Sequence, residues 1–262
     1  MLELRILDFD EIVNFRKGIA DLFRICFGQD FDPNIWDWAY QKNPTGSPVI
    51  AIALDEEKLV GHYAMIPTPF YQGNGHHGGY LSMTTMVHPN YRKLGLFVEL
   101  ASMAYAQAKP GTFVYGFPNP NSTPGFRNKL DWKISDEYRI ATLDYEAIED
   151  AMSMTIGRAH SDSYLFNEKF LDWRLSKPGA RYFVSNNLIY KEYNGEIDVL
   201  TEDAEGLSIF RGRTQKYNIL TKNQEIIDRS SSVKTYIFGY RNFDSKVDLE
   251  SIHPNLLMSD VF

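Results

Sequence analysis

One stretch of the sequence, residues 81–107, most restricts the fold that this chain can adopt. It opens with an apolar run, Leu81–Val87, that favours a β-strand, and it breaks at a His-Pro-Asn turn. From Phe97 onward, apolar residues recur at spacings of three and four, as one face of an α-helix requires. The stretch therefore predicts a strand, a tight turn and a helix.

The start of this helix is suited to an anion. The first N–H groups of a helix have no partner within it, and the helix dipole is positive there. The backbone amides of residues 93–97 can therefore face a phosphate, and Gly95 allows close approach because it has no Cβ. Arg92 and Lys93 add positive charge. The turn lacks the glycine patterns of P-loops and dinucleotide-binding loops, so neither class of site fits.

Composition sets outer limits on the function. A chain of 262 residues can form one large domain or two small ones, and its 44% apolar residues are enough for a core. The net charge of −7 argues against general binding to nucleic acid or to anionic membranes. A single cysteine, Cys26, excludes an intramolecular disulfide framework and a cysteine zinc cluster. No apolar run is long enough for a membrane span and the N-terminus is acidic, so we expect a cytoplasmic protein.

The remaining periodicities place this turn within a longer series of elements. Residues 2–6 alternate like a strand, and residues 11–27 carry a helical apolar face. Further elements are predicted as a short helix at 35–40, strands at 48–54, 59–71, 80–87 and 112–116, and a short helix at 119–129.

The segment Arg92-Lys-Leu-Gly95-Leu-Phe97 resembles the pyrophosphate loop of the GNAT N-acetyltransferases, which reads Arg/Gln-x-x-Gly-x-Gly/Ala. Phe97 departs from that pattern, since a small residue is usual there. The order of elements in residues 1–145 is also similar to the GNAT order. The resemblance implies an α/β (α+β) fold, with a mixed sheet flanked by helices, that binds acetyl-CoA. The residues it implies for acetyl-CoA are Met86, Val87, Arg92, Lys93, Leu94, Gly95, Leu96, Phe97 and Asn121.

A short sequence pattern of the first half of the chain recurs in the second half. Residues 31–42 and 166–177 share Phe, Asp, Trp and Lys at one constant offset of 135, and Pro and Gly follow each copy. One interpretation is chance similarity between two amphipathic helices; the other is a degenerate second GNAT-like half. We therefore predict a GNAT domain at residues 1–145 and a GNAT-like α+β half at 146–262. Strands are predicted in that half at 182–184, 188–193, 197–200, 207–210, 217–220 and 233–239.

Acetyl transfer to an amine needs stabilisation of an oxyanion and a proton for the departing thiolate. The resemblance places the oxyanion donor on the backbone near Met86 or Val87. The fourth strand carries no carboxylate, so His62 is the candidate base, with a histidine bonded to a backbone carbonyl as the alternative. Tyr115 is the candidate acid, with a core role as the alternative. No metal site is expected.

The resemblance to the GNAT family implies an acceptor cleft bordered by the first helices. Its candidate residues are Asp32, Trp36, Trp38 and Tyr63, because aromatic faces pack on sugar rings and a carboxylate can bind an amine. A tryptophan-rich core helix is the alternative. The resemblance favours N-acetylation of a small amine, with an amino sugar of a surface polysaccharide as first choice. Transfer of an aminoacyl or longer acyl group, a non-catalytic acyl-CoA-binding module, and assembly into a homodimer are left open.

Overall fold

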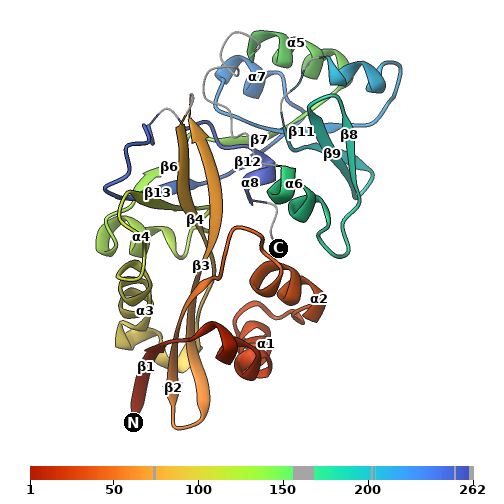
Figure 1. Cartoon of the computed structure of the whole chain (residues 1–262). Helices are drawn as coiled ribbons and strands as arrows, with labels where there is room; N and C mark the ends of the chain where they lie inside the picture. Colours follow the sequence, from red (N-terminus) through yellow and green to blue (C-terminus); the bar gives the residue numbers. More distant parts are fainter. Residues whose placement is uncertain (73–74, 156–167, 202, 204, 251, 260–262) are drawn as a thin grey trace.

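A computed structural model describes residues 1–72, 75–155, 168–201, 203, 205–250 and 252–259 of the chain. The strands gather in two mixed sheets, one in each half of the molecule (Figure 1). The first half contains β1 (Leu2–Ile6), the 3-10 helix η1 (Phe9–Phe15), α1 (Arg16–Phe27), α2 (Pro33–Trp36), the π-helix η2 (Asp37–Gln41), β2 (Val49–Asp55), β3 (Lys58–Gln72), β4 (Gly75–Val87), the 3-10 helix η3 (Pro89–Leu94), α3 (Leu96–Tyr105), β5 (Thr112–Gly116), α4 (Thr123–Lys129) and β6 (Lys133–Ser135).

The first sheet has the strand order β1-β2-β3-β4-β5-β13-β6, and β4 and β5 are its parallel pair. Helices α3 and α4 cover one face of this sheet, while η1, α1 and α2 cover the other (Figure 1). Each face has its own apolar cluster, because successive residues of a strand point to opposite faces. The predicted strand, turn and helix of residues 81–107 are confirmed as β4, η3 and α3.

Small residues allow α3 to lie close to the sheet. A Cβ on Gly61 would stand 2.8 Å from Cδ1 of Leu100 and 3.1 Å from Cβ of Ala53. Such distances are shorter than van der Waals contact, so a side chain at position 61 would force Leu100 to move. Gly61 thus lets Leu100 of α3 pack directly on β2 and β3.

The second half repeats the topology of the first. It contains β7 (Arg139–Leu143), α5 (Tyr145–Thr155), α6 (Glu168–Leu175), β8 (Tyr182–Ser185), β9 (Leu188–Tyr193), β10 (Glu196–Val199), the 3-10 helix η4 (Gly206–Phe210), β11 (Tyr217–Thr221), α7 (Gln224–Asp228), β12 (Ser232–Thr235), β13 (Phe238–Phe243) and α8 (Leu256–Ser259). Its sheet has the order β8-β9-β10-β11-β7-β12, which matches β2-β3-β4-β5-β13-β6 strand for strand. The parallel pair β10 and β11 corresponds to β4 and β5.

The two halves exchange one strand. β7 follows β6 directly in sequence but pairs with β11 and β12 in the second sheet. β13 follows β12 directly in sequence but pairs with β5 and β6 in the first sheet. The chain therefore passes from the first sheet to the second between β6 and β7 and returns to the first between β12 and β13.

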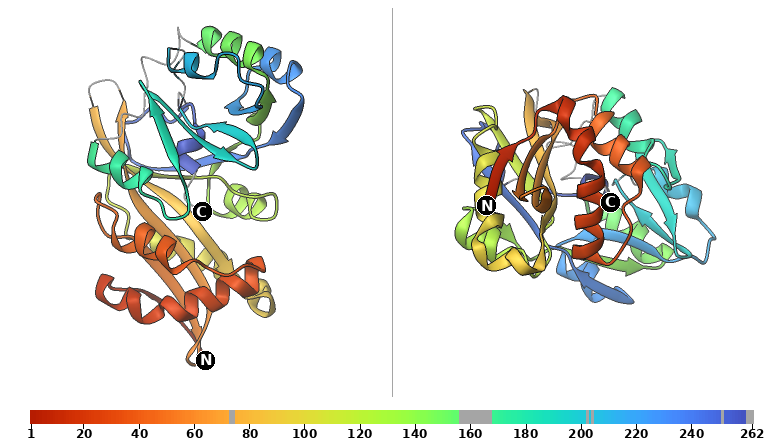
Figure 2. Two further views of the ribbon diagram at one scale, coloured as in Figure 1. Left: turned by 90° about the vertical axis from the view of Figure 1, so that its right-hand side faces the viewer. Right: turned by 90° about the horizontal axis from the view of Figure 1, so that it is seen from below.

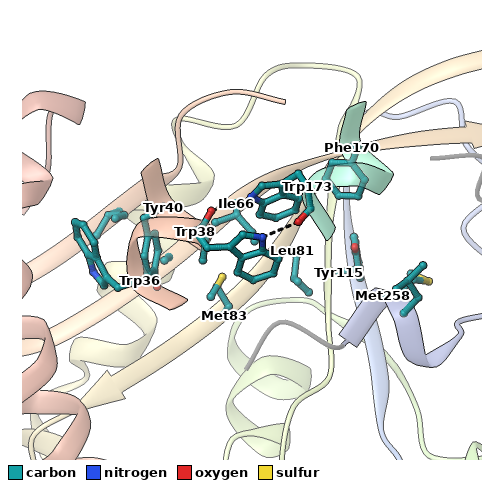
Figure 3. Packing of buried hydrophobic residues seen from close by; sticks show 14 of the residues in the cluster. Trp36, Trp38, Tyr40, Ile66, Leu81, Met83, Tyr115, Phe170, Trp173 and Met258 are labelled. Atoms are coloured by element: carbon teal, nitrogen blue, oxygen red, sulfur yellow. Dashed lines mark hydrogen bonds between the residues drawn. The ribbon is translucent and has the colours of Figure 1, made fainter. Parts of the chain in front are cut away.

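The two halves lie one above the other (Figures 1 and 2), and a pair of tryptophans joins them (Figure 3). The rings of Trp38 on η2 and Trp173 on α6 stack with centroids 4.5 Å apart. Trp38 Nε1 donates to the Trp173 carbonyl at 2.7 Å, and Trp173 Nε1 donates to the Trp38 carbonyl at 2.8 Å. Because the contacts are reciprocal, the two segments occupy equivalent places at the junction, in agreement with their constant sequence offset of 135. Both segments are helical in their described part, and residues 166 and 167 of the second segment lie outside the described residues.

Two strand predictions are wrong. Residues 207–210 form the 3-10 helix η4, since Leu207 and Phe210 are spaced so that one face of a helical turn is buried. Residues 233–239 divide between β12 and β13, because the chain crosses there from one sheet to the other. Within the described residues, no helix has the length and apolar character needed to cross a bilayer.

Candidate active site

The parallel strands β4 and β5 pair only briefly and then separate. Their paired residues run from Gly79–Phe113 to Leu81–Tyr115. Beyond Leu81 the strands enclose a cavity of about 190 Å³, called here the splay cavity. Its lining residues are Phe27, Ser82, Met83, Thr84, Thr85, Gly116, Phe117, Pro118, Asn119, Ser122, Phe126 and Trp132.

The splay cavity has an uncharged lining. Its described wall contains aromatic and aliphatic side chains together with the hydroxyl and amide groups of Ser82, Thr84, Thr85, Asn119 and Ser122, and no ionisable side chain. A charged ammonium ion would lose its hydration there without meeting a carboxylate. The cavity therefore favours neutral groups that accept or donate hydrogen bonds.

A bulge in β4 forms one wall of the cavity. His62 pairs with Met86 and Ala64 pairs with Met83, so Thr84 and Thr85 together face the single residue Tyr63. Thr84 has φ of +46°, in the left-handed region that β-branched residues rarely adopt. Backbone strain of this kind persists only where surrounding contacts hold it, and such residues often cluster at functional sites.

Two buried side chains contact Thr84. Nδ1 of His62 lies 2.8 Å from the Thr84 carbonyl oxygen, so this nitrogen carries the proton and donates it. The hydroxyl groups of Tyr40 and Thr84 form a short hydrogen bond. Burial lowers the pKa of His62 to about 4, because the charged ring would lose its hydration. Burial likewise raises the pKa of Tyr40. Both groups are therefore neutral near pH 7.

The cationic turn lies beyond the end of β4. η3 ends at Gly95, whose φ of +79° lets the chain enter α3. The side chains of Arg92 and Lys93 are exposed, and Arg92 Nε donates to the Val87 carbonyl at 3.3 Å. Leu94 and Gly95 are also exposed, whereas Leu96 is buried and anchors the first turn of α3. Two cations and free helix amides thus face solvent at one place.

Phe97 does not cover this turn. Its ring packs edge-on against Phe126 of α4, with centroids 4.9 Å apart. A Cβ on Gly125 would stand 2.4 Å from the Phe97 ring, so the glycine makes room for it. The unusual residue at position 97 is therefore accommodated by α4, and the backbone of residues 92–95 remains accessible. These features fit the pyrophosphate of acetyl-CoA at the turn and its thioester end in the splay cavity.

Comparison with known proteins agrees with this geometry. Residues 14–135 match the family model described as "Acetyltransferase (GNAT) domain". The structure aligns with a GCN5-related N-acetyltransferase from Kribbella flavida over 93% of this chain and 72% of that one, with a TM-score of 0.63 and 11% identity. The chain has the GNAT fold. No protein of curated function has a significantly similar sequence.

Two further structures share this GNAT fold. A conserved protein of unknown function from Enterococcus faecalis V583 aligns over 93% of this chain and 73% of its own, with a TM-score of 0.60 and 13% identity. The GCN5-related glucosamine N-acetyltransferase region of a fungal multi-domain GH3 β-N-acetylglucosaminidase aligns over 92% of this chain and 38% of that chain. Its TM-score is 0.52 and its identity 12%.

Several predicted site residues do not line the splay cavity. The alternative considered for His62, a strand histidine bonded to a backbone carbonyl, is confirmed, and His62 does not line the cavity. Tyr115, the candidate acid, does not line the splay cavity: it is buried beside Thr68 and Arg174 at the junction of the halves (Figure 3), and burial raises its pKa to about 12. Tyr63 points to the α3 face, where its hydroxyl lies 3.0 Å from that of Tyr105.

The aromatic residues predicted for the acceptor site do not line the splay cavity either. Trp36 is fully buried, with the Arg16 guanidinium 5.3 Å from its ring, and Trp38 is buried in the stack with Trp173 (Figure 3). Both tryptophans are core residues because η2 packs between the sheet and α6. Asp32 caps α2 by accepting from the Asn34 amide at 2.7 Å.

Three of the residues predicted to contact acetyl-CoA, Met86, Val87 and Asn121, do not line the splay cavity. The bulge lies at Thr84 and Thr85, before Met86 and Val87, and the side chain of Met86 is buried. Asn121 is exposed and does not line the cavity, whereas two neighbours on the same turn do. The side chain of Asn119 accepts from the amides of residues 121 and 122, which orders the start of α4. An asparagine at the start of the helix predicted for residues 119–129 was the sequence signal for this turn.

Proposed function

We propose that this chain is an acetyl-CoA-dependent N-acetyltransferase acting on a small primary amine. The observation that carries the proposal is the splay cavity, which is uncharged, bounded by the bulge of β4, and set between the GNAT sheet strands near the cationic turn. When bound, acetyl-CoA supplies an activated carbonyl that a neutral amine can attack with release of a thiolate. The cationic turn, the cavity wall and the bulge amides each contribute to this reaction.

The cationic turn binds the donor. Arg92 and Lys93 offer charge, and the amides around Gly95 offer hydrogen bonds to phosphate oxygens. The apolar wall of the cavity, including Met83 and Phe117, excludes water from the thioester. The bulge amides are the proposed donors to the oxyanion, and donors fixed in advance supply a large part of such rate enhancements.

The uncharged cavity supports an acceptor that is already neutral. An amino-sugar amine has a pKa of roughly 7.5–8, against roughly 10.4 for lysine, so a useful fraction is neutral near pH 7. Such an amine needs little help from a base, and no ionisable side chain lines the described cavity wall. The fungal glucosamine N-acetyltransferase region of the same fold gives further support for this acceptor class. An amino sugar of a surface glycan is therefore our proposed substrate.

Thioester turnover against a panel of amines tests the proposal. Release of free CoA thiol would be followed with glucosamine, a nucleotide-linked amino sugar, spermidine and a lysine peptide, and the product mass would identify the group transferred. We expect turnover with the amino sugars to exceed turnover with the lysine peptide by about tenfold or more near pH 7, since the neutral fractions differ by over a hundredfold. Preference for the peptide would contradict the acceptor assignment, and binding of CoA without turnover would support a non-catalytic module.

A matched pair of variants tests the place of the reaction. Ser122 and Ser153 each donate a hydroxyl to a backbone carbonyl, but only Ser122 lines the cavity. Ser122→Phe should fill the cavity and lower turnover at least about tenfold, whereas Ser153→Phe on α5 should leave it unchanged. Equal turnover in the two variants would place the reaction elsewhere.

A further inference from the structure

The bulge residue Thr84 has a left-handed backbone conformation that is unfavourable for its β-branched side chain. The left-handed conformation is unfavourable for a β-branched residue, because its Cβ comes too close to the following carbonyl oxygen. Thr84 also stands outside the residue pairs that join β4 to β3 and to β5, so neither ladder fixes it. Other contacts must hold it at the wall of the splay cavity.

Those contacts come from two different elements. Tyr40 reaches the Thr84 hydroxyl from η2, and His62 reaches the Thr84 carbonyl from β3. Both side chains are almost completely buried, with exposed fractions of 1% and 0%. Their rings also touch edge to face, with centroids 6.3 Å apart, so each limits the movement of the other.

The π-helix η2 is what brings Tyr40 to this position. Short π-helical turns are rare and are frequent at functional sites, because they shift side chains relative to a regular helix. Two aromatic contacts hold η2 in place: the Trp36 ring lies 5.6 Å from that of Tyr40, and Trp38 stacks on Trp173. The two contacts of Tyr40 and His62 with Thr84 are called here the clamp. Through η2, the clamp is anchored in the core at the junction of the halves.

We propose that Tyr40 and His62 are positioning residues that hold Thr84 in its left-handed conformation and thereby aim the bulge amides into the splay cavity. The proposal rests on the proposed function, since aimed amides matter only if a carbonyl reacts there. It assigns no proton transfer to either side chain. Both act through Thr84.

A double-mutant cycle separates positioning from chemistry. Glycine adopts the left-handed region freely, so Thr84→Gly keeps the backbone conformation without the clamp. Tyr40→Phe alone should lower kcat about tenfold or more and change the KM for acetyl-CoA less than about threefold, as expected for loss of an oriented oxyanion donor. In the Thr84→Gly background the same change should lower kcat less than about threefold. An equal loss of kcat in both backgrounds would give Tyr40 a chemical role and overturn the proposal.

Conservative variants and a matched control complete the test. Thr84→Ser keeps the hydroxyl and should retain kcat within about threefold, whereas Thr84→Val should behave like Tyr40→Phe. His62→Asn keeps a donor toward the Thr84 carbonyl and should remain active. Tyr138→Phe is the control, since Tyr138 is a buried tyrosine whose hydroxyl donates to the Ile252 carbonyl, away from the cavity.

Amide hydrogen exchange tests the clamp on the protein alone, with no amine substrate present. Tyr40→Phe should speed exchange at the protected ladder amides on either side of the bulge, within residues 82–83 and 86–87, by about tenfold or more relative to wild type, and the Tyr138→Phe control should not. Unchanged exchange at these amides would overturn the clamp even if the enzyme is active. A wild-type protein with no turnover would refute the proposed function, and the exchange rates would still decide the clamp.

Discussion

The buried neutral ring of His62 predicts a loss of stability in mild acid. Its pKa is lowered to about 4 by burial, whereas the same histidine in the unfolded chain has a pKa of about 6.5. Between these values the unfolded chain binds the extra proton and the folded chain does not, so stability falls as the pH falls. Linkage gives a loss of about 2.5 kcal/mol between pH 7.5 and pH 4.5 from this one residue.

The measurement is urea unfolding at several pH values, followed by the fluorescence of the buried tryptophans. Carboxylates and His88 also contribute to acid destabilisation, so the quantity to compare is the difference between wild type and His62→Asn. Asparagine can keep the hydrogen bond to the Thr84 carbonyl but does not titrate. The free energy of unfolding of wild type should fall about 2.5 kcal/mol more than that of the variant over this range. Parallel curves would show that His62 is not held neutral in the folded protein.

Three further perturbations test other parts of the structure. Arg92→Ala should weaken CoA binding about tenfold or more, the loss of one charge-assisted contact; calorimetry with Arg211→Ala as an exposed control checks this, and equal affinities would remove Arg92 from the site. Gly125→Ala should lower the free energy of unfolding by about 1–3 kcal/mol because its Cβ would meet Phe97. Adding Phe97→Ala should recover part of that loss, and strictly additive effects would contradict the contact. Trp173→Ala should cost about 3–5 kcal/mol; a loss below about 1 kcal/mol in urea unfolding would mean that the stacked pair does not hold the halves together.

The local parts of this fold could be predicted from the sequence. The strand, turn and helix of residues 81–107 follow from periodicity within one stretch, and Gly95 has the left-handed conformation that favours glycine. The repeated helices were visible because four residue types recur at one offset. Exchange of β7 and β13 between the sheets was not visible, because a strand's own sequence does not specify which of two similar sheets it joins.

The candidate site was harder to predict than the fold. Thr84 has no local preference for a left-handed bulge, and the contacts that hold it come from Tyr40 and His62, which are distant in sequence. Trp38 resembled a sugar-binding residue because its stacking partner, Trp173, lies on another helix. In both cases tertiary contacts, not local pattern, decide the role of the residue.

The reciprocal exchange of β7 and β13 has a consequence during protein synthesis. The ribosome delivers β5 and β6 long before β13, so the nascent first sheet has a gap between these two strands until the second half emerges. Unpaired strand edges invite association with other chains. Fragments cut between β7 and α5 should therefore be poorly soluble apart, yet recombine when mixed, because each carries the strand that the other lacks.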